Sequence, residues 1–208
     1  WGLSVVQDQN SLLNYRKYDP KGNDPDEVFD LMEKYKDYTQ YIHLRFTTKG
    51  EKSQDNCHPF PLIEEEDYQL YLMHNGTLSF NKLVIPDKQS DTRAFCEQYA
   101  APTAKAYYAV AGKDLLQNEP FIRLMDTFIT SGWTFLLYDN LGNYRVIGGT
   151  SGVYFNSEGI ELKGKVEPGT ASWWASNSYS FARDHRQPYQ SNTYSGRYSS
   201  WQEDNDWP

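Results

Sequence analysis

The stretch Tyr41-Ile42-His43-Leu44-Arg45-Phe46 predicts a β-strand with one apolar and one polar face. Apolar residues occupy positions 42, 44 and 46, so His43 and Arg45 point to the opposite side of such a strand, together with Tyr41. Burying two side chains that can carry positive charge is costly unless they are paired with opposite charges or bind a ligand. We therefore expect this face of the strand to contribute to a binding site.

Three further polar motifs follow this strand, each at the end of a predicted strand or the start of a predicted helix. The motifs contain residues that bind a carboxylate, an oxyanion or an ammonium group, and together they predict a pocket for an amino acid. The four motifs are His43-Leu44-Arg45-Phe46-Thr47-Thr48, Asn56-Cys57-His58-Pro59-Phe60, His74-Asn75-Gly76-Thr77-Leu78 and Ser90-Asp91-Thr92.

The periodicity around the motifs predicts strands, a helix, strands, helices and strands in that order, which favours an α+β layered domain over a βαβ repeat. Asp24 and Glu27 fit a capping box before one helix, whose apolar stripe includes Val28 and Tyr35. Ser90 is suited to cap a second helix that runs to about residue 99. The other predicted elements are a helix over 121–129 and strands over 1–7, 12–18, 68–73, 133–138, 144–147, 152–156 and 173–177.

The composition limits the class of protein and partner. The 208 residues suffice for one well-packed domain, and 17 Tyr, 10 Phe and 6 Trp supply large buried areas. A formal net charge of −8 argues against a nucleic-acid or anionic-membrane partner, because such a surface needs clustered Lys and Arg. No apolar run approaches the roughly 20 residues that span a bilayer. We therefore predict neither nucleic acid nor membrane as a partner.

The two cysteines, Cys57 and Cys96, are too few for a disulfide framework in a chain of this length. We expect small, partly buried, reduced thiols in a cytoplasm-like compartment. Cys57 can converge in space with His58, His43 and His74. Polar side chains satisfied by hydrogen bonds explain such a group better than a metal site, because zinc-ligand spacing is absent. We predict no metal and no other cofactor.

The composition changes near residue 183. Residues 183–208 are rich in Ser, Tyr, Asn, Gln and Asp and contain almost no aliphatic residue, so they predict a tail rather than part of a core. Residues 1–182 would then form the domain. The tail has aromatic residues suited to anchoring it on a partner or on its own domain, namely Tyr189, Tyr194, Tyr198, Trp201 and Trp207.

In its four ordered motifs the sequence resembles class II glutamine amidotransferases, members of the N-terminal-nucleophile hydrolase superfamily. It looks closest to the short stand-alone members encoded by bacteriophages, and the resemblance covers roughly residues 1–181. It implies a four-layer αββα sandwich that hydrolyses the side-chain amide of glutamine to glutamate and ammonia.

The resemblance also assigns roles to residues. Arg45 matches the arginine that holds the substrate α-carboxylate, since a guanidinium grips a carboxylate through two parallel hydrogen bonds. Asn75 and Gly76 match the pair that forms the oxyanion hole, through a side-chain amide and a backbone N–H. Asp91 matches the acid that binds the substrate α-ammonium. The residues expected to shape the rest of the pocket are Thr47, Thr48 and His74.

The sequence departs from the family at the nucleophile. The family uses an N-terminal cysteine activated by its own α-amine, whereas residue 1 here is Trp, and Cys57 lies in a motif that has no such role. The spacing from Trp1 to His43 matches the part of the phage-type members that follows their first strand. The resemblance thus implies that the first strand, the glutamine-binding loop and the nucleophile are missing from this sequence.

Each assigned residue also has a simpler structural interpretation. Arg45 is suited to a buried ion pair with Asp91, Asn75-Gly76 to a type I′ hairpin turn, and Asp91 to the first turn of a helix. The ordered set of motifs favours a site over these separate alternatives, although Asp91 alone fits both interpretations equally.

Two functional hypotheses follow. The first is a glutaminase that passes ammonia to an acceptor enzyme, if the N-terminal cysteine is supplied. The second is a catalytically inactive structural or interaction protein of a bacteriophage particle, which binds partners through the tail 183–208 and through the sheet edge that a lost first strand exposes. The first places the protein in the host cytoplasm and the second in the virion.

Overall fold

The computed structural model describes residues 1–7, 11–18, 26–45, 47–79, 82–129, 133–148, 153–156, 161–162 and 173–176. These residues form a mixed α/β structure with three sheets, in which every strand pairing is antiparallel. The chain divides into two compact units, residues 1–150 and 151–208. No helix in the described part of the chain has the length and apolar character that crossing a membrane requires.

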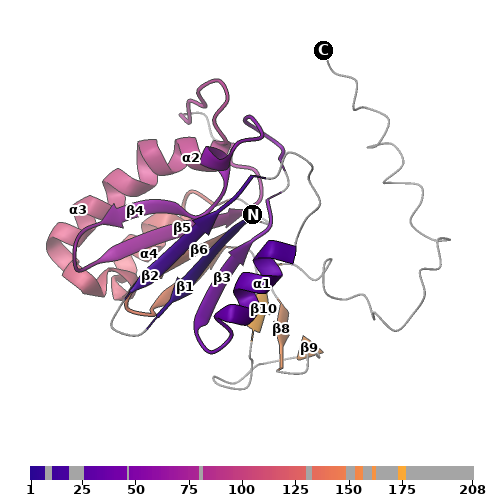
Figure 1. The fold of residues 1–208 in the computed structure, drawn as a ribbon. Coiled ribbons are helices and arrows are strands. Elements are labelled where there is room, and N and C mark those ends of the chain that lie inside the picture. Colours follow the sequence, from indigo (N-terminus) through magenta and orange to yellow (C-terminus); the bar gives the residue numbers. More distant parts are fainter. Residues whose placement is uncertain are drawn as a thin grey trace, which may run out of the picture. The chain divides into compact units, whose positions relative to one another are not determined.

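A three-stranded sheet carries the N-terminal part of the first unit (Figure 1). Its central strand β1 (Gly2–Val6) pairs with β2 (Leu12–Arg16) and β3 (Thr39–His43). All three strands were expected from the alternating pattern. The prediction that Arg45 lies on the third strand is wrong, because β3 ends at His43 and Arg45 belongs to the following loop. Helix α1 (Asp26–Lys34) packs against this sheet through Val28, whereas its predicted capping box at Asp24 lies outside the described residues.

The second sheet of this unit has the strand order β4-β5-β6-β7. Its strands are β4 (Phe60–Glu64), β5 (Gln69–Asn75), β6 (Thr134–Asp139) and β7 (Tyr144–Gly148). The predicted β6–β7 hairpin is confirmed. Strand β4 was not predicted, because Pro61 interrupts its pattern; the strand tolerates a proline since it lies at the sheet edge and its register shifts beside Pro61.

Ser90 caps helix α2 (Asp91–Phe95), as predicted: its hydroxyl accepts a hydrogen bond from the Arg93 N–H. The predicted helix end near residue 99 is wrong. A π-helical turn, η3 (Cys96–Ala100), leads directly into α3 (Ala101–Ala111), and Pro102 is the second residue of α3, immediately after this widened turn. The 3-10 segment η4 (Gly112–Gln117) and α4 (Glu119–Asp126) follow.

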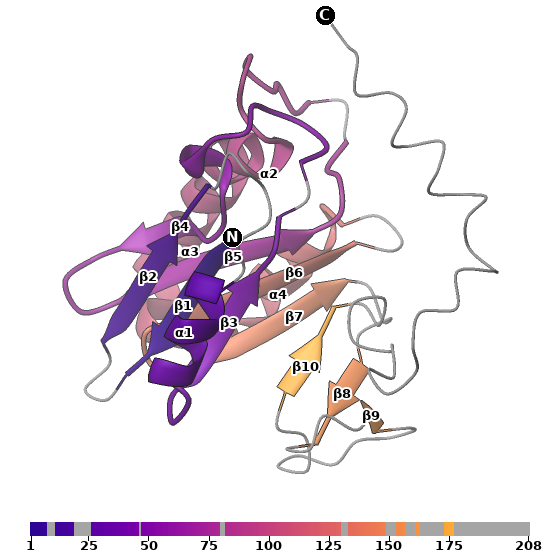
Figure 2. The ribbon, with the colours of Figure 1, turned by 45° about the vertical axis from the view of Figure 1, so that its right-hand side comes forward.

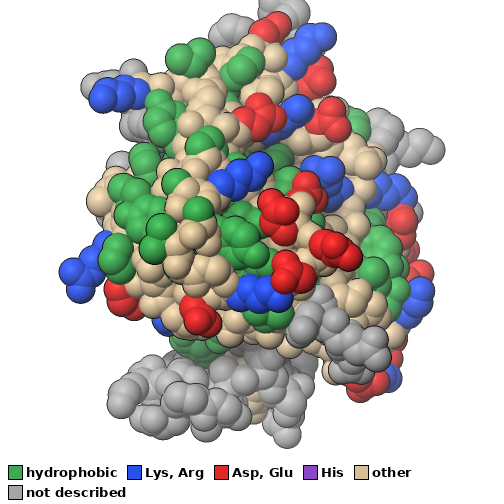
Figure 3. Space-filling view, turned by 90° about the vertical axis from the view of Figure 1, so that its left-hand side faces the viewer, with side chains coloured by type: hydrophobic (Ala, Val, Ile, Leu, Met, Phe, Trp, Pro, Cys, Tyr) green, Lys and Arg blue, Asp and Glu red, His purple; other side chains and the backbone are tan. Residues whose placement is uncertain are grey.

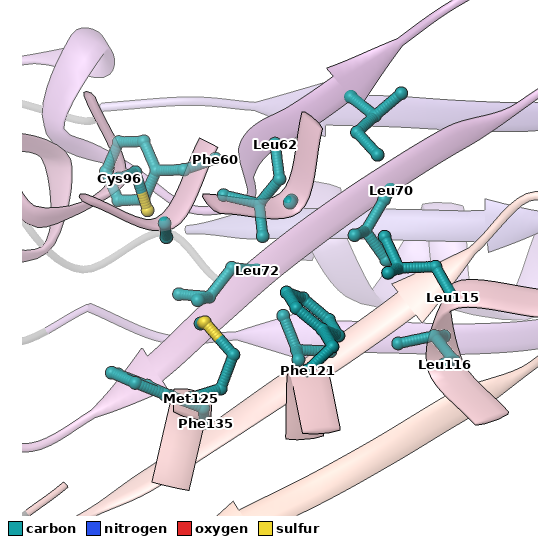
Figure 4. Close-up of a cluster of buried hydrophobic side chains, with 14 of the residues drawn as sticks. Phe60, Leu62, Leu70, Leu72, Cys96, Leu115, Leu116, Phe121, Met125 and Phe135 are labelled. Atoms are coloured by element: carbon teal, nitrogen blue, oxygen red, sulfur yellow. The ribbon is translucent and has the colours of Figure 1, made fainter. Parts of the chain in front are cut away.

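Three apolar clusters hold the first unit together. Helices α3 and α4 pack on one face of the β4–β7 sheet, where side chains such as Leu72, Phe121 and Phe135 point toward one another (Figure 4). Helix α1 covers one face of the β1–β3 sheet. The remaining faces of the two sheets meet through Tyr41 and Tyr138, whose rings stack at 4.2 Å between centroids. Figure 2 shows α1 and α3 on opposite sides of the strands.

The second unit contains a small sheet with the order β10-β8-β9. Its strands are β8 (Val153–Phe155), β9 (Glu161–Leu162) and β10 (Trp173–Ala175). Strands β8 and β10 were predicted, and β9 was not. The predicted tail 183–208 lies outside the described residues.

Candidate functional site

The structure brings the four polar motifs into contact. The first and second motifs meet where the imidazole rings of His43 and His58 lie 3.9 Å apart between centroids. The third motif contacts the fourth, since His74 Nδ1 lies 2.9 Å from the Thr92 hydroxyl. The second motif also reaches the fourth, because the Asn56 side-chain oxygen accepts a hydrogen bond from the Ser90 N–H. Motifs that span almost fifty residues of sequence therefore form one connected group.

The segment Asn75–Thr77 leaves the end of β5 and lies at the centre of this group. Asn75 is the last residue of β5 and pairs with Thr134 of β6. The alternative prediction of a two-residue hairpin at Asn75-Gly76 is wrong, because the two sheet partners of β5 are β4 and β6, and neither begins directly after Gly76. Gly76 has φ 136°, and a Cβ there would lie 2.6 Å from the Trp133 ring, so only glycine fits this position.

Asp91 is buried and joins the segment to helix α2. One carboxylate oxygen accepts a hydrogen bond from the Leu78 N–H at 2.5 Å, and the other accepts one from the Thr92 N–H at 2.9 Å. Asp91 is also the first residue of α2. The predicted helix-start role is therefore confirmed, and in addition the carboxylate fixes the chain just beyond Gly76.

Arg45 lies in the loop after β3, and the hydrogen-bond partners that its guanidinium has among the described residues are neutral groups. It donates to the Thr47 hydroxyl at 3.0 Å and to the Lys49 carbonyl at 2.8 Å. The predicted alternative, an Arg45–Asp91 ion pair, is not formed. Burial lowers the pKa of the guanidinium, and the nearby Cys57 and Asp91 partly offset this effect.

The loop that contains Arg45 reaches the segment Asn75–Thr77 through a threonine pair. The hydroxyl of Thr48 lies 3.4 Å from that of Thr77. Asn56 holds the other end of this loop, because its side-chain amide donates to the carbonyls of Glu51 and Lys88. The loop that carries Arg45, predicted to bind a carboxylate, thus lies next to the end of β5, which carries the residues predicted to form an oxyanion hole.

Three histidines line the interior of the site: His58 and His74 are buried and His43 is half-buried. His43 Nε2 lies 2.9 Å from the His74 carbonyl oxygen, and His43 Nδ1 lies 3.1 Å from His58 Nδ1. Burial lowers the pKa of His43 to about 4 and that of His74 to about 3, and it places the pKa of His58 well below its usual value. All three rings are therefore neutral near pH 7. The predicted convergence of these residues is confirmed, and no metal-binding group is found within the described ranges.

Both cysteines are free and buried, as predicted. The Cys57 thiol lies 3.5 Å from the carbonyls of Lys17 and Ser53, so it packs as a structural group next to the site.

A cavity of about 290 Å³ opens between Arg16, Phe60 and Arg93, and none of the residues predicted to bind substrate lines it. On the face in Figure 3, acidic and basic side chains are interspersed.

The sequence placed His43 on a face expected to contribute to a binding site and allowed His43 and His58 to converge, but it did not predict the hydrogen bond between their rings. Their contact depends on the approach of a loop to a strand, which residue spacing does not reveal. No protein-family model and no curated protein sequence matches this chain.

Proposed function

We propose that residues 1–182 form a class II glutamine amidotransferase-like domain of the αββα type and that its four motifs bind glutamine. The observation that carries this proposal is the position of the Arg45 loop beside the segment Asn75–Thr77, joined by the Thr48–Thr77 contact. Arg45, suited to the α-carboxylate of glutamine, and Asn75-Gly76, suited to its side-chain amide, then lie on adjacent segments of the chain.

The bonding of Arg45 and of Asp91 leaves capacity for such a ligand. The Arg45 guanidinium has a hydroxyl and a carbonyl as partners, so its positive charge is available to an α-carboxylate. Each Asp91 oxygen accepts one hydrogen bond in the described structure, and a carboxylate oxygen has two lone pairs, so an α-ammonium group still has an acceptor. The Asn75 amide and the Gly76 N–H are assigned to the side-chain carbonyl of glutamine.

Hydrolysis adds a requirement that this sequence does not meet by itself. A thiolate must attack the amide carbon, the oxyanion must be stabilised while ammonia leaves, and water must then cleave the thioester. The 208 residues contain no N-terminal cysteine, so we propose hydrolysis only for a form of the protein that supplies this nucleophile. Binding, in contrast, is a property of the motifs present and is tested directly.

Calorimetric titration with three ligands tests the binding proposal. L-Glutamine carries both charged groups, glutaramate lacks the ammonium group, and 4-aminobutanamide lacks the carboxylate. We expect Arg45→Ala to weaken glutamine and glutaramate binding by roughly 10- to 100-fold, the value of a charged hydrogen-bonded contact, and to leave 4-aminobutanamide unchanged. Arg93→Ala is the control, because Arg93 already pairs with Glu97 at 2.9 Å. Undetectable glutamine binding by the wild-type protein, or equal binding by Arg45→Ala, would refute the proposal.

A second candidate function is an inactive interaction protein, such as a structural component of a bacteriophage particle. Strands β3 and β7 lie at the edges of their sheets, and Tyr144 and Val146 of β7 are exposed, which is the arrangement that strand addition by a partner uses. In this case the tail 183–208 is a second contact. Absence of glutamine binding, together with detection of the protein in purified particles by mass spectrometry, distinguishes this candidate from the first.

A further inference from the structure

The segment Asn75–Thr77 is hydrogen-bonded immediately before and immediately after its three residues. On the far side, the Leu78 N–H donates to Asp91. On the near side, His43 Nε2 lies 2.9 Å from the carbonyl oxygen of His74. Together with the pairing of Asn75 with Thr134 in the sheet, these two contacts position the Asn75 side chain and the Gly76 N–H.

The contact with the His74 carbonyl determines the protonation of two rings. A carbonyl oxygen only accepts hydrogen bonds, so His43 Nε2 must carry the hydrogen. His43 is half-buried, and its pKa of about 4 keeps the ring neutral near pH 7, so its Nδ1 is a bare acceptor. His58 Nδ1, at 3.1 Å, must then be the donor. The His58 Nε2 atom is consequently unprotonated, and in the described structure it is buried without a hydrogen-bond partner.

The sequence makes this contact possible through Gly2. In the sheet, Gly2 of β1 is the cross-strand neighbour of His43 of β3. A Cβ atom at position 2 would lie 1.7 Å from the His58 carbonyl oxygen, so only glycine lets the loop that contains His58 approach the strand. The His58 ring is thereby placed against His43, and Phe60 packs against its other side at 4.8 Å between centroids.

We propose that His58 and His43 are positioning residues for the glutamine site: His58 orients His43, and His43 holds the His74 carbonyl, which fixes the oxyanion-hole groups of Asn75 and Gly76. Neither imidazole is assigned a contact with the substrate. This inference rests on the proposed function for its functional meaning, but the hydrogen-bond relay itself is a property of the free protein.

The first experiment measures the tautomers of the wild-type protein by long-range ¹H–¹⁵N correlation NMR near pH 7. We expect His43 to carry its proton on Nε2 and His58 to carry its proton on Nδ1. A bare Nδ1 on His58, or a bare Nε2 on His43, would overturn the relay. This measurement needs neither a variant nor a ligand, so it decides the question even if substitutions at His58 prevent folding.

The second experiment compares His58→Asn with His58→Phe. The asparagine amide retains a donor near the place of Nδ1, whereas phenylalanine fills similar space without one. We expect His58→Phe to weaken glutamine binding roughly tenfold and to shift the Gly76 amide resonance, and we expect His58→Asn to stay within about twofold of the wild-type affinity. The Leu78 amide should remain protected from exchange in both variants, because Asp91 holds it independently.

The outcomes separate the two proposals. If the wild-type protein binds no glutamine, the proposed function fails. The relay is then tested by the Gly76 amide resonance, which should shift in His58→Phe and not in His58→Asn. If glutamine binds and His58→Phe retains the wild-type affinity, the positioning role is refuted. If both variants lose affinity equally, the imidazole acts through packing and not through its donor, which also refutes the proposal.

Discussion

Asp91 is the residue whose two carboxylate oxygens connect the start of helix α2 to the chain beyond Gly76. Both oxygens accept backbone N–H groups, from Leu78 and from Thr92. In Asp91→Asn, one of these N–H groups faces an amide NH₂ instead of an acceptor. We expect a loss of about 1–3 kcal/mol in the free energy of unfolding, the cost of a buried unsatisfied polar group, measured by urea denaturation.

Asp87→Asn is the matched control for this prediction, because Asp87 is exposed and lies in the loop just before α2. Its substitution should change the free energy of unfolding by less than about 0.5 kcal/mol. Equal unfolding midpoints for the two variants would show that the Asp91 carboxylate does not hold the segment Asn75–Thr77.

At the scale of elements, the two sheets of the first unit are joined by a buried polar contact as well as by stacked tyrosines. The Ser4 hydroxyl of β1 donates to the Asn14 side-chain oxygen and so accepts from the Tyr138 hydroxyl of β6, at 2.5 Å in each case. Ser4→Ala leaves the Tyr138 hydroxyl buried without its partner and should cost about 1–3 kcal/mol. Tyr138→Phe leaves Ser4 still bonded to Asn14 and should cost about 0.5–1.5 kcal/mol.

The double variant completes this comparison between the sheets. The double variant, with Ser4→Ala and Tyr138→Phe together, lacks both hydroxyls. Its loss in the free energy of unfolding should therefore be smaller than the sum of the losses in the two single variants. Thermal or urea unfolding of the four proteins gives the coupling directly. Additive costs would contradict the Ser4–Tyr138 hydrogen bond itself, and a larger cost for Tyr138→Phe than for Ser4→Ala would contradict its assigned direction.

The elements also show how far sequence reasoning reaches. Alternation predicted β1, β2 and β3, and the cap at Ser90 fixed the start of α2, because these patterns depend on local geometry alone. Strand β4 and the continuation into α3 were missed because Pro61 and Pro102 normally end such patterns, and an edge position and a π-helical turn accommodate them here. The contact of His43 with His58 depends on a close approach at Gly2, and no local pattern encodes it.

At the scale of the whole molecule, the lowered pKa values of His43, His58 and His74 predict a steep loss of stability in mild acid. Their pKa values in the folded state lie below the value of about 6.5 that an unfolded chain has, at about 4 for His43 and about 3 for His74. Between pH 6.5 and these values the unfolded chain binds protons that the folded protein does not. The stability contribution is therefore complete above about pH 6.5 and is lost as the pH falls toward 4.

The expected slope is about 1.4 kcal/mol per pH unit for each histidine that stays neutral in the folded state. Urea unfolding between pH 6.5 and 5 isolates this effect, because most carboxylates remain ionised there. His58→Asn removes one titrating ring while keeping a donor toward His43, so it should lower the slope by the share of one histidine. Arg45 adds to the penalty for charging His43 and His58, so Arg45→Ala should move their titration to higher pH and flatten the acid end of the curve. A wild-type slope below that of a single histidine would mean that these rings accept protons in the folded state, and the neutral relay that holds the His74 carbonyl would then be wrong.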